Sequence, residues 1–175
     1  SDDAVKVWSE ILKKIKNSRL ILKSSVSHSE IHFKDLFEKE GVLKKVIFKN
    51  RSKNFGDHIN LYKEIDLCLD TFPYTGVTTT CEALWMNVPV VSLAGFNFNS
   101  RCGESILINS NLKDLVAKNK DDYISKVVSL ANDSDKLKKI RKFIFYEVLK
   151  TNTFNTKKFA ANFWKSILDT YTNHK

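Results

Sequence analysis

The stretch DLCLDTFPYTGVTTTCEALW, residues 66–85, decides the fold of this chain. Its apolar beginning, Asp66–Leu69, predicts a short strand, and a turn with Pro73 and Gly76 follows. Three threonines then open a predicted helix that runs to about Met86. A strand that passes through a glycine turn into a helix is typical of α/β proteins with a parallel sheet.

The start of this helix has the chemistry of an anion site. The first turn of a helix leaves backbone N–H groups without partners and carries the positive end of the helix dipole. Thr78, Thr79 and Thr80 add hydroxyl donors there, and Gly76 allows a ligand to approach the backbone. Glu82 follows within reach of a ribose hydroxyl. Because threonines also cap ordinary helices, the local pattern leaves open both a nucleotide diphosphate site and a plain turn.

The rest of the chain alternates short predicted strands with predicted helices. Val5, Trp8 and Ile11 recur at helical spacing and predict an opening amphipathic helix. Further strands are predicted at 19–23, 46–48, 88–93 and 115–116, and further helices at 30–39, 57–65, 101–109, 121–131, 133–149 and 156–172.

This alternation indicates right-handed crossovers and a parallel sheet. Ligands of such sheets bind beyond the carboxyl ends of the strands. The segments that leave those ends are 49–55, 70–77 and 94–101. Because the threonine turn belongs to this set, topology and motif indicate the same site.

A longer string extends the motif. The sequence DTFPY-x-G-x-TTTCEALWM-x-VPVV, residues 70–91, resembles the C-terminal catalytic lobe of the O-linked N-acetylglucosamine transferase/SPINDLY family. Segments 7–12 (VW with IL), 17–20 (NSRL), 95–101 (G with SR) and 154–157 (FNTK) fall in the family's order. The resemblance implies a Rossmann-like parallel sheet flanked by helices, the C-terminal donor-binding lobe of a GT-B glycosyltransferase with extra C-terminal helices.

The resemblance also implies roles for individual residues. Gly76, Val77 and the threonines match the turn that holds the donor diphosphate, and Glu82 matches an acidic residue that bonds the ribose. His58 matches a histidine that contacts the nucleotide; a surface or capping histidine is the alternative. Arg51 and Lys53 match a segment that touches the base, against the alternative of a solvated loop.

Three further side chains have less specific roles. Tyr62 could stack on the ligand or bond to it, although a helical tyrosine is more often a residue at the edge of a core. Arg101 could reach a phosphate or pair with a nearby carboxylate instead. Asp70 is expected to tie down the turn by accepting backbone N–H bonds. Val77 and Leu61 replace a histidine and a basic residue of the animal transferases, which leaves the donor sugar open.

The function implied by the resemblance is transfer of a sugar from a nucleoside diphosphate to a serine or threonine hydroxyl, without a metal. UDP-N-acetylglucosamine is the first expected donor; GDP-fucose and UDP-glucose are alternatives. Nothing in the chain makes a persuasive general base, so we expect an isolated donor-binding lobe, residues 1–175, that is inactive alone. Helix 156–172 is expected to pack toward an N-terminal lobe that, with a repeat array, binds the acceptor protein. A non-catalytic nucleotide-binding module and an epimerase-like lobe are the rival interpretations.

Composition limits the other classes of function. The chain has 175 residues, 42% of them hydrophobic and 28% charged, as in a soluble globular domain without a membrane span. Its net charge of +9 is spread along amphipathic helices, which argues against a nucleic-acid partner. Cys68, Cys81 and Cys102 are expected to be buried free thiols in the cytoplasm. His28 and His32 lie four apart, but no metal site is expected because nothing completes one.

Overall fold

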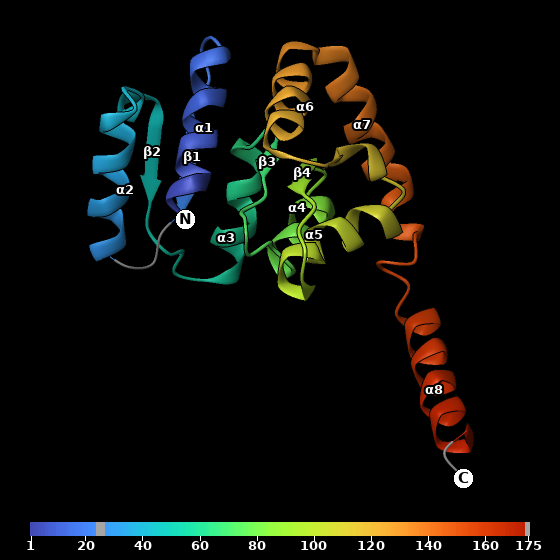
Figure 1. Cartoon of the computed structure of the whole chain (residues 1–175). Coiled ribbons are helices and arrows are strands. Elements are labelled where there is room, and N and C mark those ends of the chain that lie inside the picture. The colour runs from blue at the N-terminus through green and yellow to red at the C-terminus, as the bar shows by residue number, and fades with distance from the viewer. Residues whose placement is uncertain (24–26, 174–175) are drawn as a thin grey trace.

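A computed structural model describes residues 1–23 and 27–173 (Figure 1). Strands and helices alternate over most of this length. The helices are α1 (Asp2–Lys14), α2 (Ser27–Lys39), α3 (Phe55–Asn60), α4 (Thr78–Trp85), α5 (Phe98–Asn109), α6 (Lys120–Asn132), α7 (Ser134–Glu147) and α8 (Thr156–Asn173). The strands are β1 (Leu20–Lys23), β2 (Val46–Lys49), β3 (Cys68–Leu69), β4 (Val90–Leu93) and β5 (Val116–Ala117), and short 3-10 turns are η1 (Leu43–Lys45), η2 (Leu61–Glu64), η3 (Lys113–Leu115) and η4 (Val148–Lys150).

All strand pairs are parallel, as predicted, but hydrogen bonds divide the strands into two groups. One group pairs β1 with β2, and the other has the order β3-β4-β5. In the described residues no ladder joins β1 to β3. The strand expected at Asp66 begins only at Cys68, whose N–H donates to the Pro89 carbonyl. One step earlier the ladder would need an N–H from Pro89, which has none, and the Asp66 carbonyl instead accepts the Arg141 guanidinium of α7 at 3.3 Å.

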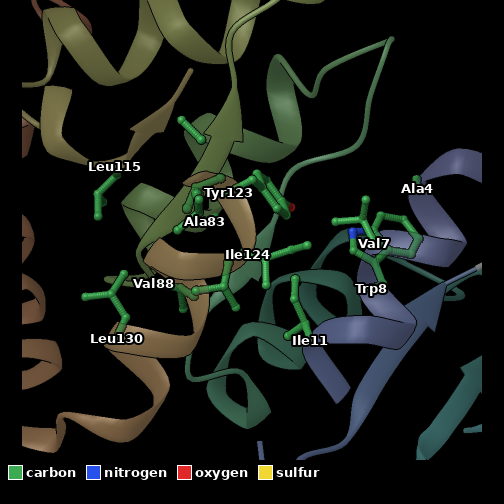
Figure 2. Packing of buried hydrophobic residues seen from close by; sticks show 14 of the residues in the cluster. Ala4, Val7, Trp8, Ile11, Ala83, Val88, Leu115, Tyr123, Ile124 and Leu130 are labelled. Atoms are coloured by element: carbon green, nitrogen blue, oxygen red, sulfur yellow. The ribbon is translucent and has the colours of Figure 1, made fainter. Parts of the chain in front are cut away.

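The core joins the two groups of strands through α1. This helix packs against α2 and against α6, so it contacts both parts of the molecule. Figure 2 shows Trp8 and Ile11 of α1 beside Ile124 of α6, with Val88 and Leu130 further into the same cluster. The predicted amphipathic face of the opening helix is confirmed, since Val5, Trp8, Ile11 and Leu12 are all buried.

Two helices begin earlier than their hydrophobic patterns predicted. α5 begins at Phe98 because the Asn97 side chain accepts the Ser100 N–H, and the Ser100 hydroxyl accepts the Asn97 N–H in return. α3 begins at Phe55 because Asn54 caps it. Both caps lie in segments that leave the carboxyl ends of strands, so they shape the face on which a ligand was expected.

The last helix, α8, extends away from the rest of the molecule (Figure 1). None of its residues is buried. Its exposed side chains include Phe159, Phe163, Trp164, Ile167 and Leu168, and the rings of Phe159 and Phe163 stack with centroids 6.0 Å apart. These side chains share one face at helical spacing, which is typical of a helix that packs on something.

Several smaller expectations can be compared with the structure. The three cysteines are free, as expected, but they are only partly buried. His32 bonds to Asp2 at 2.9 Å, while the side chain of His28 lies outside the described residues. In the described part of the chain no helix is long and apolar enough to cross a bilayer. The same residues contain no group of three His, Cys, Asp or Glu side chains that could hold a metal ion.

Candidate functional site

Asp70 holds the turn that follows β3. Its carboxylate accepts the Gly76 N–H at 2.7 Å and the Ser92 hydroxyl at 2.6 Å. Its own carbonyl accepts the Tyr123 hydroxyl at 2.9 Å. The side chain is buried, and this burial raises the pKa of the Asp70 carboxyl. The predicted role of Asp70, tying down the turn, is confirmed.

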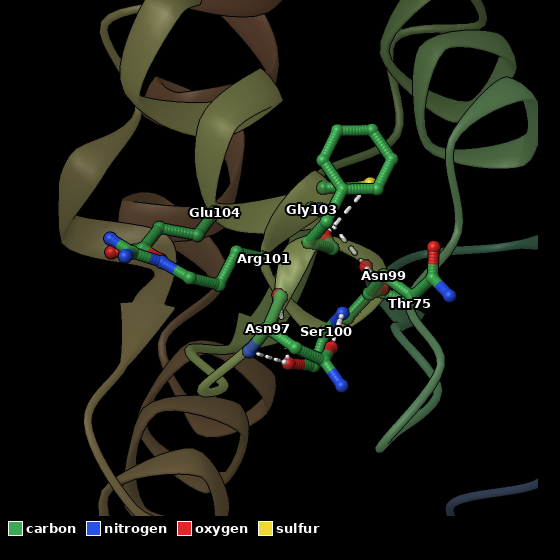
Figure 3. A network of polar contacts seen from close by, with 9 residues as sticks. Thr75, Asn97, Asn99, Ser100, Arg101, Gly103 and Glu104 are labelled. Atoms are coloured by element: carbon green, nitrogen blue, oxygen red, sulfur yellow. Dashed lines mark hydrogen bonds and ion pairs between the residues drawn. The ribbon is translucent and has the colours of Figure 1, made fainter.

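A second set of bonds ties the same turn to the start of α5 (Figure 3). The Thr75 N–H and hydroxyl both donate to the Asn99 carbonyl, at 3.2 and 3.0 Å. The Thr75 hydroxyl also accepts the Gly103 N–H at 3.1 Å. Gly95, in the loop after β4, lies against Ser100 near the start of α5. A Cβ on Gly95 would be 2.2 Å from the Ser100 Cβ. The loops after β3 and β4 therefore form one rigid unit.

The start of α4 differs from most other helix starts in the chain. Val77 is its N-cap and no side chain caps it, whereas side chains cap α1, α3, α5, α6 and α7. Thr78 and Thr79 are exposed there. Their backbone N–H groups and hydroxyls therefore present donors at the positive end of a helix, in the segment where a ligand was expected.

One expectation about this turn needs correction. Thr80 was expected to offer its hydroxyl to a ligand, but that group is buried and donates to the Gly76 carbonyl at 3.1 Å. Gly76 has a packing role beside the expected one, because a Cβ at this position would lie 2.5 Å from the Thr79 Oγ1 and 2.8 Å from the Thr80 Oγ1. Glycine is thus required by the packing of the turn itself.

His58, Glu82 and Tyr62 come together, and their polar atoms bond to one another. The His58 Nε2 lies 2.9 Å from Glu82 Oε2, and the Nδ1 lies 2.7 Å from the Lys23 Nζ. Both ring nitrogens are therefore engaged within this cluster. The Tyr62 hydroxyl is directed to the Thr79 carbonyl and Glu82 at 3.3 and 3.4 Å, and burial raises its pKa.

A hollow of about 820 Å³ opens beside this cluster. Arg51 and Lys53, both exposed, lie on its wall with His58, as predicted for the segment after β2. Lys23 also lines the hollow, although it was not among the site residues predicted from the sequence. The signal was present, because Lys23 is the last residue of a strand whose carboxyl end faces the ligand side. The hollow is lined by Lys23, Arg51, Ser52, Lys53, Asn54, Phe55 and His58.

Arg101 takes the second of its two expected roles. Its Nε donates to Glu104 at 2.8 Å, and this bond raises the pKa of the guanidinium. Figure 3 shows the side chain directed away from Thr75 and Asn99. The structure therefore does not bring Arg101 to the start of α4, and its pairing partner is one helical turn away on α5.

Comparison with known proteins gives one consistent result. Residues 2–163 match the family model of glycosyl transferase family 41. A tomato protein described as probable UDP-N-acetylglucosamine–peptide N-acetylglucosaminyltransferase SPINDLY is 34% identical over 90% of this chain and 17% of its own length. The Arabidopsis thaliana protein of that description is 37% identical over 78% of this chain and 15% of its own length.

A solved structure supports the same relationship. A mutant of the Thermobaculum terrenum O-GlcNAc transferase superposes with a TM-score of 0.88 and 27% identity, over 94% of this chain and 32% of its own. The chain thus has the α/β fold of part of a GT-B glycosyltransferase, and it spans about a sixth of the length of its plant relatives. It belongs to glycosyl transferase family 41.

Proposed function

We propose that this chain is the donor-binding lobe of a protein O-glycosyltransferase, which moves a sugar from a nucleoside diphosphate to serine or threonine hydroxyls. The observation that carries the proposal is the start of α4, where exposed threonines and uncapped N–H groups are held rigidly between Asp70 and α5. The description of the tomato and Arabidopsis relatives as probable UDP-N-acetylglucosamine–peptide N-acetylglucosaminyltransferases supports a UDP-N-acetylglucosamine donor. GDP-fucose and UDP-glucose remain the alternative donors.

In this proposal α4 stabilises the leaving group. When the sugar leaves, negative charge develops on the diphosphate, and preorganised N–H donors lower the energy of that state. Thr78 and Thr79 are the side chains placed to add hydroxyl donors. The proposal assigns charge stabilisation to these groups and not to a metal ion. Glu82 orients the ribose in the same scheme.

The remaining parts of the reaction are assigned to the parent protein. We propose that the acceptor protein and the group that activates its hydroxyl belong to an N-terminal lobe. The aromatic face of α8, with Phe159, Phe163 and Trp164, is the surface that we expect to pack against that lobe. The fragment by itself then binds a nucleotide sugar but does not transfer the sugar. We expect the protein to act in the cytoplasm.

A single substitution tests the donor site. Loss of one hydrogen bond to a charged group costs about 1.5–3 kcal/mol, so we expect Thr79→Val to weaken binding of the sugar nucleotide about 10- to 100-fold. Calorimetric titration of the chain with UDP, GDP and their sugar conjugates measures this. Thr156→Val is the matched control, because Thr156 is also exposed in the first turn of a helix, and that helix, α8, extends away from the rest of the molecule (Figure 1). Unchanged affinity in a folded Thr79→Val variant would remove α4 from the site.

A further inference from the structure

The Lys23 ammonium is held in a defined position beside the hollow. It donates to the Ser52 hydroxyl at 2.9 Å and to the His58 Nδ1 at 2.7 Å. An ammonium has three N–H donors and no acceptor, so among its contacts with the described residues these two leave one donor available. Because Lys23 also lines the hollow, that third donor is at hand for a ligand.

The same count of donors and acceptors shows which ring nitrogen of the neutral His58 imidazole carries the hydrogen. Since Lys23 can only donate, the Nδ1 of His58 must accept, and the ring hydrogen is then on Nε2. From Nε2 it is donated to the Glu82 carboxylate at 2.9 Å. His58 therefore connects the anchored carboxylate of α4 to the ammonium at the end of β1 and holds both in place. In this role it positions the two charged groups.

The order of these contacts matches the order of parts in a nucleotide. The start of α4 is the proposed diphosphate site, and Glu82, the proposed ribose contact, lies one turn further along. His58 follows Glu82, and Lys23 follows His58. The next part of a nucleotide beyond the ribose is the base. Lys23 is thus placed at the base end of the site.

We infer that Lys23 contacts the nucleobase and donates a hydrogen bond to O4 of uracil or O6 of guanine. The inference rests on the proposed function and adds a selectivity to it. Guanine O6 and uracil O4 are acceptors, whereas adenine N6 and cytosine N4 are donors. A group that can only donate therefore favours keto bases and opposes amino bases at this position.

Two pairs of nucleotides test the inference, GDP with ADP and UDP with CDP. The members of each pair have the same ribose and diphosphate and differ at the base. We expect the chain to bind GDP more tightly than ADP, and UDP more tightly than CDP. Each preference should be about tenfold or more, because adenine and cytosine lose a hydrogen bond whose donor, the Lys23 ammonium, is charged. Lys23→Met should reduce both preferences to about unity. Comparing ratios of dissociation constants cancels the contributions of the diphosphate and the ribose.

Lys49→Met is the matched control. Lys49 lies directly across from Lys23 in the parallel ladder and is also the last residue of its strand. It pairs with Glu64 at 2.7 Å and is not among the residues that line the hollow. The two variants lose the same charge from neighbouring positions. The control should keep the base preferences of the unmodified chain.

The outcomes separate the two proposals. If Lys23→Met binds nucleotides with the original base preferences, or if the unmodified chain shows no preference, the role of Lys23 is refuted and the donor site stands. If the unmodified chain binds none of the four at millimolar concentration, the donor site itself fails, and the role of Lys23 fails with it.

A second measurement needs neither a variant nor a ligand. Nitrogen-15 NMR of the imidazole side chains distinguishes the two neutral tautomers of histidine. We expect His58 to carry its hydrogen on Nε2 in the free chain. A hydrogen on Nδ1 would contradict the donation by Lys23 and overturn the inference.

Discussion

Asp70 offers a sharp test of how the loop before α4 is held. Its two carboxylate oxygens accept separate donors, the Gly76 N–H at 2.7 Å and the Ser92 hydroxyl at 2.6 Å. The substitution Asp70→Ala removes both acceptors at a buried position. Each unsatisfied buried donor costs about 1–3 kcal/mol. The alanine variant no longer carries the cost of burying a carboxylate, which offsets part of this loss. We therefore expect the free energy of unfolding to fall by about 3 kcal/mol, in the lower half of the range for two unsatisfied donors.

Asp70→Asn is the matched comparison. The amide oxygen can accept the Gly76 N–H, and the amide nitrogen can donate to the Ser92 oxygen. Both pairs then survive with the same side-chain shape. We therefore expect the asparagine variant to differ from the unmodified chain by less than about 1 kcal/mol in the free energy of unfolding.

Urea unfolding of the three chains, followed by circular dichroism, measures these differences. In thermal unfolding, a loss of about 3 kcal/mol corresponds to a fall of roughly 6–12 °C in Tm for a chain of this size. Equal stability of the alanine and asparagine variants would refute the reasoning, since only the asparagine variant keeps a polar partner for Gly76 and Ser92. A loss below about 1 kcal/mol for alanine would refute it as well.

Three further predictions concern pH, packing and thiol chemistry. Burial raises the pKa of Asp70 above its ordinary 3.8, so its stabilising contribution is complete below that pH and is lost as the pH rises through the folded-state value. The free energy of unfolding of the unmodified chain, relative to Asp70→Asn, should therefore fall as the pH rises from about 4, and a rise would contradict this. Gly95→Ala should cost about 1–3 kcal/mol in thermal unfolding, because its Cβ would be 2.2 Å from the Ser100 Cβ; an unchanged Tm would show that the loop gives way. Burial raises the pKa of the Cys68 thiol to about 12, so iodoacetamide should alkylate it at about pH 8 on the order of a thousandfold more slowly than in the unfolded chain, as mass spectrometry would show. Comparable rates in the two states would mean that Cys68 is open to solvent.

Much of the architecture was predictable from local patterns. Val5, Trp8, Ile11 and Leu12 recur with the period of a helix, and their burial followed from that period. Asp70 follows an apolar strand and precedes a glycine turn, which is enough to predict a carboxylate that accepts backbone N–H groups. Short strands that alternate with helices predicted parallel pairing, and every pair is parallel.

Where local and distant contacts compete, the sequence was a poorer guide. Arg141, 75 residues beyond Asp66, donates to the Asp66 carbonyl, and no local pattern in the sequence indicates that partner. Arg101 could reach either a phosphate or a carboxylate by its length, and only the position of Glu104 on α5 decided between them. Long side chains have many conformers, so their partners follow from the fold and not from the local pattern.

The sequence by itself determined the parallel α/β architecture, the turn and helix start at residues 76–80, and, through its resemblance, the family. Only the tertiary structure decided which polar groups face a ligand. Thr80 is used within its own turn, and both nitrogens of His58 are engaged. Lys23 comes from β1 to complete that cluster from 35 residues before His58. A hydrogen bond satisfies a group only when its partner is brought within about 3 Å, and for partners distant in sequence that depends on how the whole chain packs.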